Sequence, residues 1–247
     1  MEFFHSSSRA ALVGAAAVLA SFAAKAAEAV PFVGCPSDGQ MGPVAAPKSG
    51  PKMVNIDPAA AKALAWYQAR DSEGALAPRG WKCFGLYGSS GVGLAIAPSG
   101  ALNDVSRPIA GPAVVLSHDF GGTSGRFAVA KTAARVFSDK EKAFVASVIA
   151  EGIEPKENFP TGPYPADALT YKTPTTVEFV TPAGKDGLGT ADRLARAALP
   201  VVGLARIVDS PDGPDLYLLS ARLPAAQASL APAIVGAAEA TLPSSSQ

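Results

Sequence analysis

The chain has 247 residues, and its 21 basic and 21 acidic residues give a formal net charge of zero at pH 7. This length suits one large domain or at most two small ones. Like charges form no block anywhere, which argues against a nucleic-acid binder and against a polybasic membrane binder.

Residues 1–29 have the pattern of a cleavable secretory signal peptide. Arg9 precedes an apolar run over residues 10–24, and Ala27-Glu28-Ala29 supplies the small residues that signal peptidase accepts. The run of about 15 residues is short for a membrane span, which needs roughly 20. A lipid anchor on Cys35 and a retained N-terminal anchor stay open as alternatives. We expect a protein of the periplasm or the extracellular space with no stable membrane span.

Two cysteines, Cys35 and Cys83, lie beyond the signal peptide. In an oxidising compartment they predict one disulfide, since no Cys-x-x-Cys spacing indicates a reactive thiol. Closing a loop of about 48 residues stabilises a fold by roughly 4 kcal/mol in the chain-entropy treatment. The bridge would fasten residues 30–56, a Pro- and Gly-rich extended arm, to the single domain predicted over residues 30–247.

Helix and strand signals follow in the first half of the domain. Asp57 as N-cap and Pro58 at the first helical position predict a helix that runs to about Arg70. Short apolar stretches at 82–86 and 93–97 flank a glycine-rich turn and predict a hairpin. Residues 112–117 predict a buried strand.

The second half alternates in the same way. Ser138 and Glu141 match a capping box for the second of its helices. The predicted elements are helices at 126–137 and 139–151, a strand at 169–181 that Pro174 could break, a helix at 191–198 after Thr190, strands at 201–208 and 215–222, and a C-terminal helix interrupted by Pro232. The fold class is α+β, with a mostly antiparallel sheet and helices packed largely on one face.

The loop between residues 117 and 126 is the first candidate for chemistry. A loop that joins a strand to a helix N-terminus points backbone N–H groups outward and favours an anion. His118 titrates near neutral pH and could act as a general base that Asp119 orients. The alternative is structural, with glycines that permit a tight turn. The binding candidates here are Gly121, Gly122, Thr123, Ser124 and Arg126.

Ser89 and Ser90 are the candidate nucleophiles for a hydrolase with His118 as base. Their surroundings do not match the Gly-x-Ser-x-Gly elbow, so this hypothesis depends on residue types alone. Trp66, Trp81 and Tyr87 could line a ligand groove, although aromatic residues more often pack in a core or a hairpin.

Metal sites have little support in the sequence. His118 is the only histidine beyond the signal peptide, and two paired cysteines leave no thiol for zinc. Asp209, Asp212 and Asp215 share one turn and could ligate calcium, but their spacing departs from the EF-hand loop. We expect no metal and no cofactor.

Two segments, Arg79–Gly91 and Val177–Thr190, resemble stretches of a family of uncharacterised secreted bacterial proteins. The resemblance implies export and a single domain, and it carries over no activity and no catalytic residue. The sequence thus favours a non-enzymatic exported protein that binds a small ligand or an envelope protein. The alternative is a hydrolase or transferase that uses His118 and the Gly121–Arg126 loop.

Overall fold

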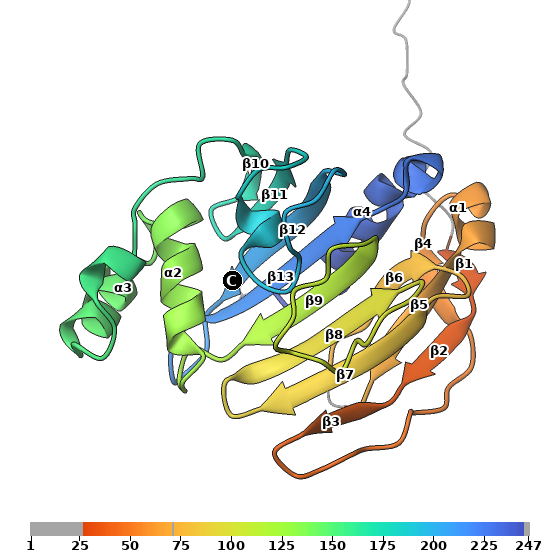
Figure 1. The fold of residues 1–247 in the computed structure, drawn as a ribbon, viewed down its shortest axis with the longest axis horizontal. Helices are drawn as coiled ribbons and strands as arrows, with labels where there is room; N and C mark the ends of the chain where they lie inside the picture. Colours follow the sequence, from red (N-terminus) through yellow and green to blue (C-terminus); the bar gives the residue numbers. More distant parts are fainter. Residues whose placement is uncertain (1–26, 71, 245–247) are drawn as a thin grey trace, which may run out of the picture.

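The computed structural model describes residues 27–70 and 72–244, which form three β-sheets and four α-helices (Figure 1). The predicted signal peptide lies mostly outside these residues. Within the described part of the chain, no helix has the length and apolar character that a membrane crossing requires. The helices are α1 (Pro58–Ala63), α2 (Arg126–Val136), α3 (Lys142–Ala150) and α4 (Ala231–Thr241), with 3-10 helices at Lys156–Asn158, Leu188–Thr190 and Ala225–Leu230.

The large sheet has eight strands. Every neighbouring pair is antiparallel except β3 and β7, which run parallel. The α+β class with a mostly antiparallel sheet is confirmed. In spatial order the strands are β10 (Ala168–Thr173), β11 (Thr176–Thr181), β12 (Val201–Val208), β13 (Asp215–Arg222), β9 (Ala113–Asp119), β8 (Gly91–Ala97), β7 (Lys82–Gly88) and β3 (Ser37–Gly39).

Two smaller sheets lie beside it (Figure 1). One joins β2 (Phe32–Cys35), β5 (Leu64–Ala69) and β6 (Ala75–Pro78), and the other pairs β1 (Ala27–Val30) with β4 (Lys52–Asn55). The arm predicted over residues 30–56 is therefore built into the sheets. Strand β1 includes the three residues that were predicted to end the signal peptide.

The large sheet is covered on both faces, and strand β9 shows this most clearly. Val114 and Leu116 belong to a core shared with β5, β6 and α4, whereas Ala113 and Val115 belong to a core shared with α2 and α3. Alternate side chains of a strand point to opposite faces, so one strand supplies both cores. We call these two sides of the sheet the α4 face and the α2 face.

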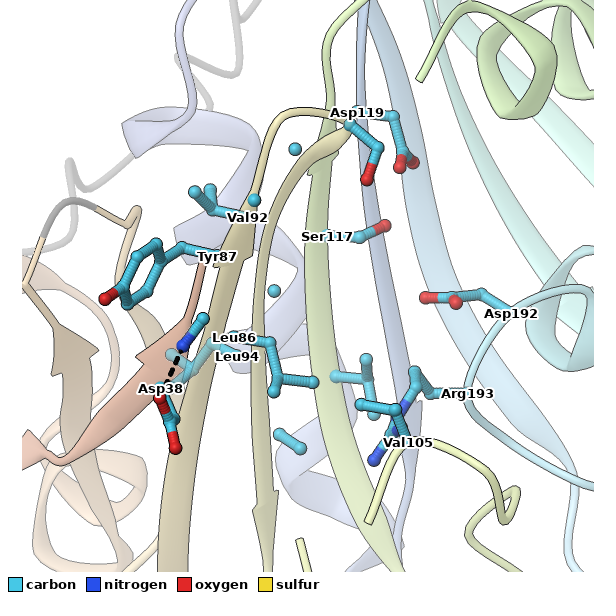
Figure 2. A pocket seen from close by; sticks show the side chains of 17 residues that line it. Asp38, Leu86, Tyr87, Val92, Leu94, Val105, Ser117, Asp119, Asp192 and Arg193 are labelled. Atoms are coloured by element: carbon cyan, nitrogen blue, oxygen red, sulfur yellow. Dashed lines mark hydrogen bonds between the residues drawn. The ribbon is translucent and has the colours of Figure 1, made fainter. Parts of the chain in front are cut away.

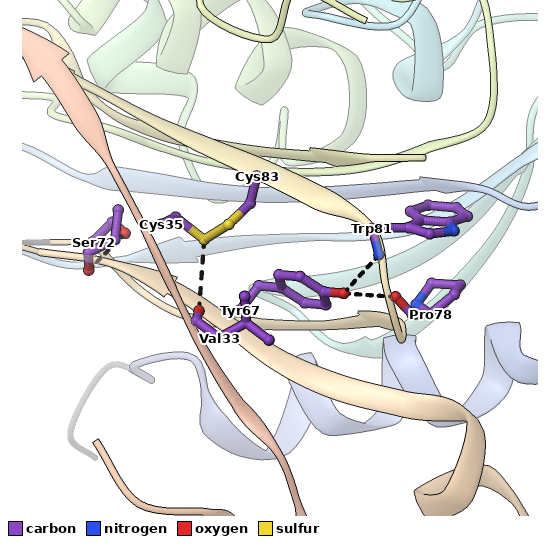
Figure 3. Close-up of a disulfide and its surroundings, with 8 residues drawn as sticks. Val33, Cys35, Tyr67, Ser72, Pro78, Trp81 and Cys83 are labelled. Carbon is purple, nitrogen blue, oxygen red and sulfur yellow. Dashed lines mark hydrogen bonds between the residues drawn. A yellow bond between two sulfur atoms is a disulfide. The ribbon is translucent and has the colours of Figure 1, made fainter. Parts of the chain in front are cut away.

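The disulfide between Cys35 and Cys83 is confirmed (Figure 3). It joins β2 of the small sheet to β7 of the large sheet, with the two Cα atoms 5.3 Å apart. Close by, the Tyr67 hydroxyl donates to the carbonyl oxygen of Pro78 at 2.7 Å and accepts from the backbone N–H of Trp81 at 3.1 Å. The bridge and this buried tyrosine together hold the small sheet against the large one.

Most predicted elements form with shifted ends, including both hairpins and the strand at 112–117. The helix predicted over residues 58–70 is wrong beyond Ala63. Its second half is strand β5, which lies between β2 and β6. Leu64 to Tyr67 are buried without a break. A run that is buried on both faces has no polar side. Its pattern of apolar residues therefore cannot distinguish a helix from a central strand.

Three other local predictions also fail. No helix forms at 191–198, and α3 begins at Lys142 with no side-chain cap, so the Ser138–Glu141 capping box is absent. Glu141 instead lies 3.4 Å from the Lys140 ammonium. Pro232 lies in the first turn of α4 and starts the helix rather than interrupting it, as expected for a residue without an N–H.

Candidate functional site

A cleft with two compartments lies on the α2 face of the large sheet. The first compartment, of about 310 Å³, lies over β7, β8 and β9. The second, of about 490 Å³, lies beside α2. Ser90, Asp119 and Asp192 line both compartments, so they mark the place where the two meet. These volumes suit a small ligand.

Strand alternation brings Ser117 and Asp119 into this cleft (Figure 2). Both lie on the same side of β9 as Val115, which packs in the α2-face core. Gly93 pairs with Ser117 and Gly91 pairs with Asp119 in the neighbouring strand β8. Side chains are missing at both partner positions, and this leaves space above the strand.

Gly91 is required by the backbone itself. Its φ is +154°, and a Cβ atom there would lie 2.2 Å from the carbonyl oxygen of His118. Gly93 is different, because an added Cβ atom would meet nothing within 4 Å. The fold thus requires glycine at position 91. At position 93 the fold has room for a side chain, and its absence leaves the compartment open.

The two carboxyl groups of the cleft are hard to ionise. Desolvation raises the pKa of Asp119 from 3.8 to about 7, repulsion from Asp192 adds to this effect, and the nearby Ser117 hydroxyl opposes it. Desolvation also raises the pKa of Asp192, against the attraction of Arg193. Asp192 is open to solvent in the cleft, but the surrounding protein displaces much of its hydration. Repulsion is mutual, so the pair holds a proton more readily than either group alone.

Two of the cationic side chains around the cleft have partners, and a third is only partly satisfied. The Lys131 ammonium lies 2.7 Å from Glu154, and Arg135 donates to the carbonyl oxygen of Gly162 at 3.2 Å. Arg193 donates through Nη2 to two backbone carbonyl groups of the loop before β9, but its Nε and Nη1 atoms are buried without a hydrogen-bond partner. Within the described part of the chain, neither cleft aspartate forms a salt bridge.

The Ser117 hydroxyl is a second unsatisfied group. Ser117 is 9% exposed, and its buried Oγ atom makes no hydrogen bond of normal geometry, although it lies close enough to the Asp119 carboxyl group to lower the pKa of that group. Figure 2 shows this side chain between Asp119 and Asp192, directed into the first compartment. A buried hydroxyl without a partner costs free energy, so a ligand that bonds to it would recover that cost.

His118 lies on the opposite face of β9 from Asp119. Its ring stacks on Tyr217 with centroids 4.0 Å apart, and its Nε2 atom lies 3.3 Å from Oδ2 of Asp215. Desolvation lowers the pKa of His118, and Asp215 partly opposes that effect. The structure therefore does not bring His118 together with Asp119 and Ser90, as a hydrolytic triad would require. Ser89 also lies apart, accepting from Gln40 at 3.1 Å.

The Gly121–Arg126 loop binds carboxylates of its own chain. The Gly121 N–H donates to Oδ1 of Asp215 at 2.9 Å. Arg126 donates to the Glu151 carboxylate from Nη2 at 2.6 Å and from Nε at 2.8 Å. A Cβ atom on Gly121 would lie 2.0 Å from the carbonyl oxygen of Pro214, so this glycine permits close backbone approach. Of the other predicted binding residues, Gly122 and Thr123 line neither compartment and Ser124 lines the second.

The predicted aromatic residues are divided between two places. Tyr87 lines the first compartment and donates its hydroxyl to the carbonyl oxygen of Gly42. Trp66 is buried in the α4-face core instead, and Trp81 packs against that core. Among the described residues, no three His, Cys, Asp or Glu side chains are grouped so that they could hold a metal ion. Asp215 and Asp209, from the turn considered for calcium, contact His118 and Lys140.

Sequence reasoning missed Ser117 and Asp192. The period of two along the strand would have found Ser117, because it shares a face with Asp119. No local signal marks Asp192, which lies in the irregular segment that was predicted as a helix. Comparison of the chain with protein-family models, curated proteins and solved structures finds no match in any of the three.

Proposed function

We propose that this chain is an exported protein that binds a small polar ligand in the cleft around Asp119, Asp192 and Ser117. The observation that carries the proposal is a cleft whose central polar groups are incompletely satisfied. The two carboxylates have no salt bridge among the described residues, and the buried hydroxyl has no hydrogen bond. A buried hydroxyl is normally satisfied, so a ligand is the partner that Ser117 lacks, and the exposed Asp192 is accessible to the same ligand.

Export is supported by the signal-like N-terminus and by the Cys35–Cys83 disulfide. Disulfides persist in oxidising compartments and are rare in reducing ones. Fractionation of cells that produce the full chain tests this part. We expect the protein in the periplasm or the medium with its disulfide formed, and a cytosolic protein with two free thiols would contradict it.

Binding in the cleft is tested with a steric block at Gly93. Gly93→Leu inserts a side chain into the first compartment without removing any charge, and the site has room for its Cβ atom. A panel of small polar solutes is titrated against the parent and the variant by calorimetry. We expect at least one solute to bind the parent and to lose that binding in Gly93→Leu. Binding that the block leaves unchanged would place the ligand elsewhere.

Acid–base catalysis is a second candidate function, favoured by one observation. Asp119 has a pKa of about 7 and lies beside Ser90 in a cleft, as general acids and bases do when their pKa is tuned toward the working pH. The test is hydrolysis of nitrophenyl esters and glycosides by the parent and by Asp119→Asn. Turnover in the parent that falls at least about a hundredfold in the variant would support catalysis. No turnover in the parent would leave ligand binding as the function.

A further inference from the structure

We infer that the ligand is a protonated amine with a short apolar chain, whose ammonium group lies between Asp119 and Asp192. This inference rests on the proposed binding function and specifies its ligand class. Two features of the cleft lead to it. One is the balance of charge at the junction of the compartments, and the other is the surface that surrounds it.

The charge balance at the junction is negative, because two carboxyl groups lie beside a single guanidinium group, that of Arg193. Asp119 and Asp192 come from β9 and from the segment after the 3-10 helix Leu188–Thr190, and repulsion between them acts on Asp119. The Nη2 atom of Arg193 donates to two backbone carbonyl groups, and its charge lowers the pKa of Asp192, so one of the two carboxyl groups remains without a balancing cation. An ammonium ion carries three donors and no acceptor, so it can bond to both carboxylates at once. The Ser117 hydroxyl offers a third acceptor in the same place.

The surroundings of the junction favour an organic cation. Leu86, Ala95 and Val115 line the floor of the first compartment, and Val105 forms part of its wall. A short hydrocarbon chain on the ammonium would cover this apolar surface, which a metal ion would leave wet. Calcium prefers six to eight oxygen ligands, and two carboxylates with one hydroxyl fall well short of that number.

The experiment compares probes that share a chain and differ in charge. Butylamine and 1,4-diaminobutane supply the ammonium, butanol and butyrate supply the same chain without it, and calcium chloride supplies a metal cation. Each is titrated by calorimetry at pH 8 against the parent, Asp119→Asn, Asp192→Asn and Gly93→Leu. Asp186→Asn is the matched control, because this aspartate is 69% exposed and pairs with Arg196 away from the cleft.

The expected pattern is specific. The two amines bind the parent at least tenfold more tightly than butanol, and butyrate does not bind. Each cleft Asp→Asn change weakens amine binding at least about tenfold, as loss of a charged hydrogen-bond partner does. Gly93→Leu abolishes binding with all charges present, and Asp186→Asn leaves it unchanged. Thermal melts of each variant establish that it is folded.

Other outcomes overturn the inference in distinguishable ways. Butanol or butyrate binding as tightly as the amines, with loss in Gly93→Leu, would refute the amine and keep the binding function. Calcium binding that needs Asp119 and excludes the amines would refute it in favour of a metal. If amines do not bind the folded parent, the inference fails. If, in addition, no probe or solute of any class loses binding in Gly93→Leu, the proposed function fails with it.

Discussion

Replacing Asp119 by Asn is expected to stabilise this protein at pH 8. The side chains are nearly the same size, so the change removes an ionisable group and leaves the packing intact. In the folded protein desolvation and Asp192 raise the pKa of Asp119 from 3.8 to about 7. Above that pH the folded state must hold a charge that water would solvate better, and the Asn variant is free of that cost.

The magnitude follows from linkage. The pKa of Asp119 is higher in the folded state than in the unfolded state, so the folded state binds the proton more tightly. The stability that this proton contributes is fully present below about pH 4. It is lost as the pH rises through about 7. A rise in pKa from 3.8 to about 7 corresponds to about 4 kcal/mol. Asp119 is not fully buried and water screens part of the effect, so we expect about 2 to 4 kcal/mol.

Urea denaturation of the parent and of Asp119→Asn at several values between pH 4 and pH 8 measures the effect. Other titrating groups are common to both proteins and cancel in the difference between their free energies of unfolding. That difference should be near zero at pH 4 and grow through pH 7. Asp186→Asn should show a flat difference within about 0.5 kcal/mol. A flat difference for Asp119→Asn would refute the desolvated carboxylate on which the proposed site depends.

Three further predictions concern the frame of the molecule. Arg222→Met should lower the free energy of unfolding by about 3 kcal/mol in urea denaturation, because the buried guanidinium satisfies four backbone carbonyl groups of two loops; a loss under 1 kcal/mol would contradict this. Replacing Cys35 and Cys83 by Ser should cost about 3 to 4 kcal/mol in the same assay, and an unchanged midpoint would show that the bridge is dispensable. Mass spectrometry of the exported chain should find its N-terminus at Ala27 or earlier, because a cut after Ala29 would remove three of the four residues that pair β1 with β4; a chain that begins at Val30 would contradict it.

Local chemistry was enough to predict the elements whose signals are local. The turn between β12 and β13 contains Pro211 and the Asp212-Gly213 pair, and the glycine-rich turn at residues 88–91 joins β7 to β8. Such residues fix turn geometry whatever surrounds them. Helix α2 likewise begins at the predicted residue, Arg126.

Elements determined by distant partners could not be predicted in this way. Strand β5 exists because Phe32–Cys35 and Ala75–Pro78 flank it, and the intrinsic preference of its residues gives way to that burial. The segment at 191–198 forms no helix because Leu194 bridges to Ile109 and because Arg222 binds the carbonyl oxygen of Ala195. Contacts across so much sequence leave no periodic pattern in a local window.

In the candidate site too, local sequence signals predicted one part and tertiary contacts determine the rest. Asp119 was identified as the neighbour that could orient His118, but this assignment ignored strand alternation, which places the two side chains on opposite faces of β9. Asp192 reaches the cleft through the irregular segment that Arg222 holds at Ala195, so only the tertiary structure places it beside Asp119. Sequence reasoning thus found one of the two carboxylates and grouped it with the wrong neighbours.

Stability and binding should oppose each other at Asp119. An uncompensated carboxylate in a cleft lowers the free energy of unfolding, and a neutral residue of equal size would hold the strand as well. A group that costs stability and serves no packing role is typical of functional sites. The same substitution therefore tests both ideas, because Asp119→Asn should melt at a higher temperature than the parent at pH 8 and bind the amine more weakly. A purely structural aspartate would lose stability on that change, and the opposite sign separates a binding group from a structural one.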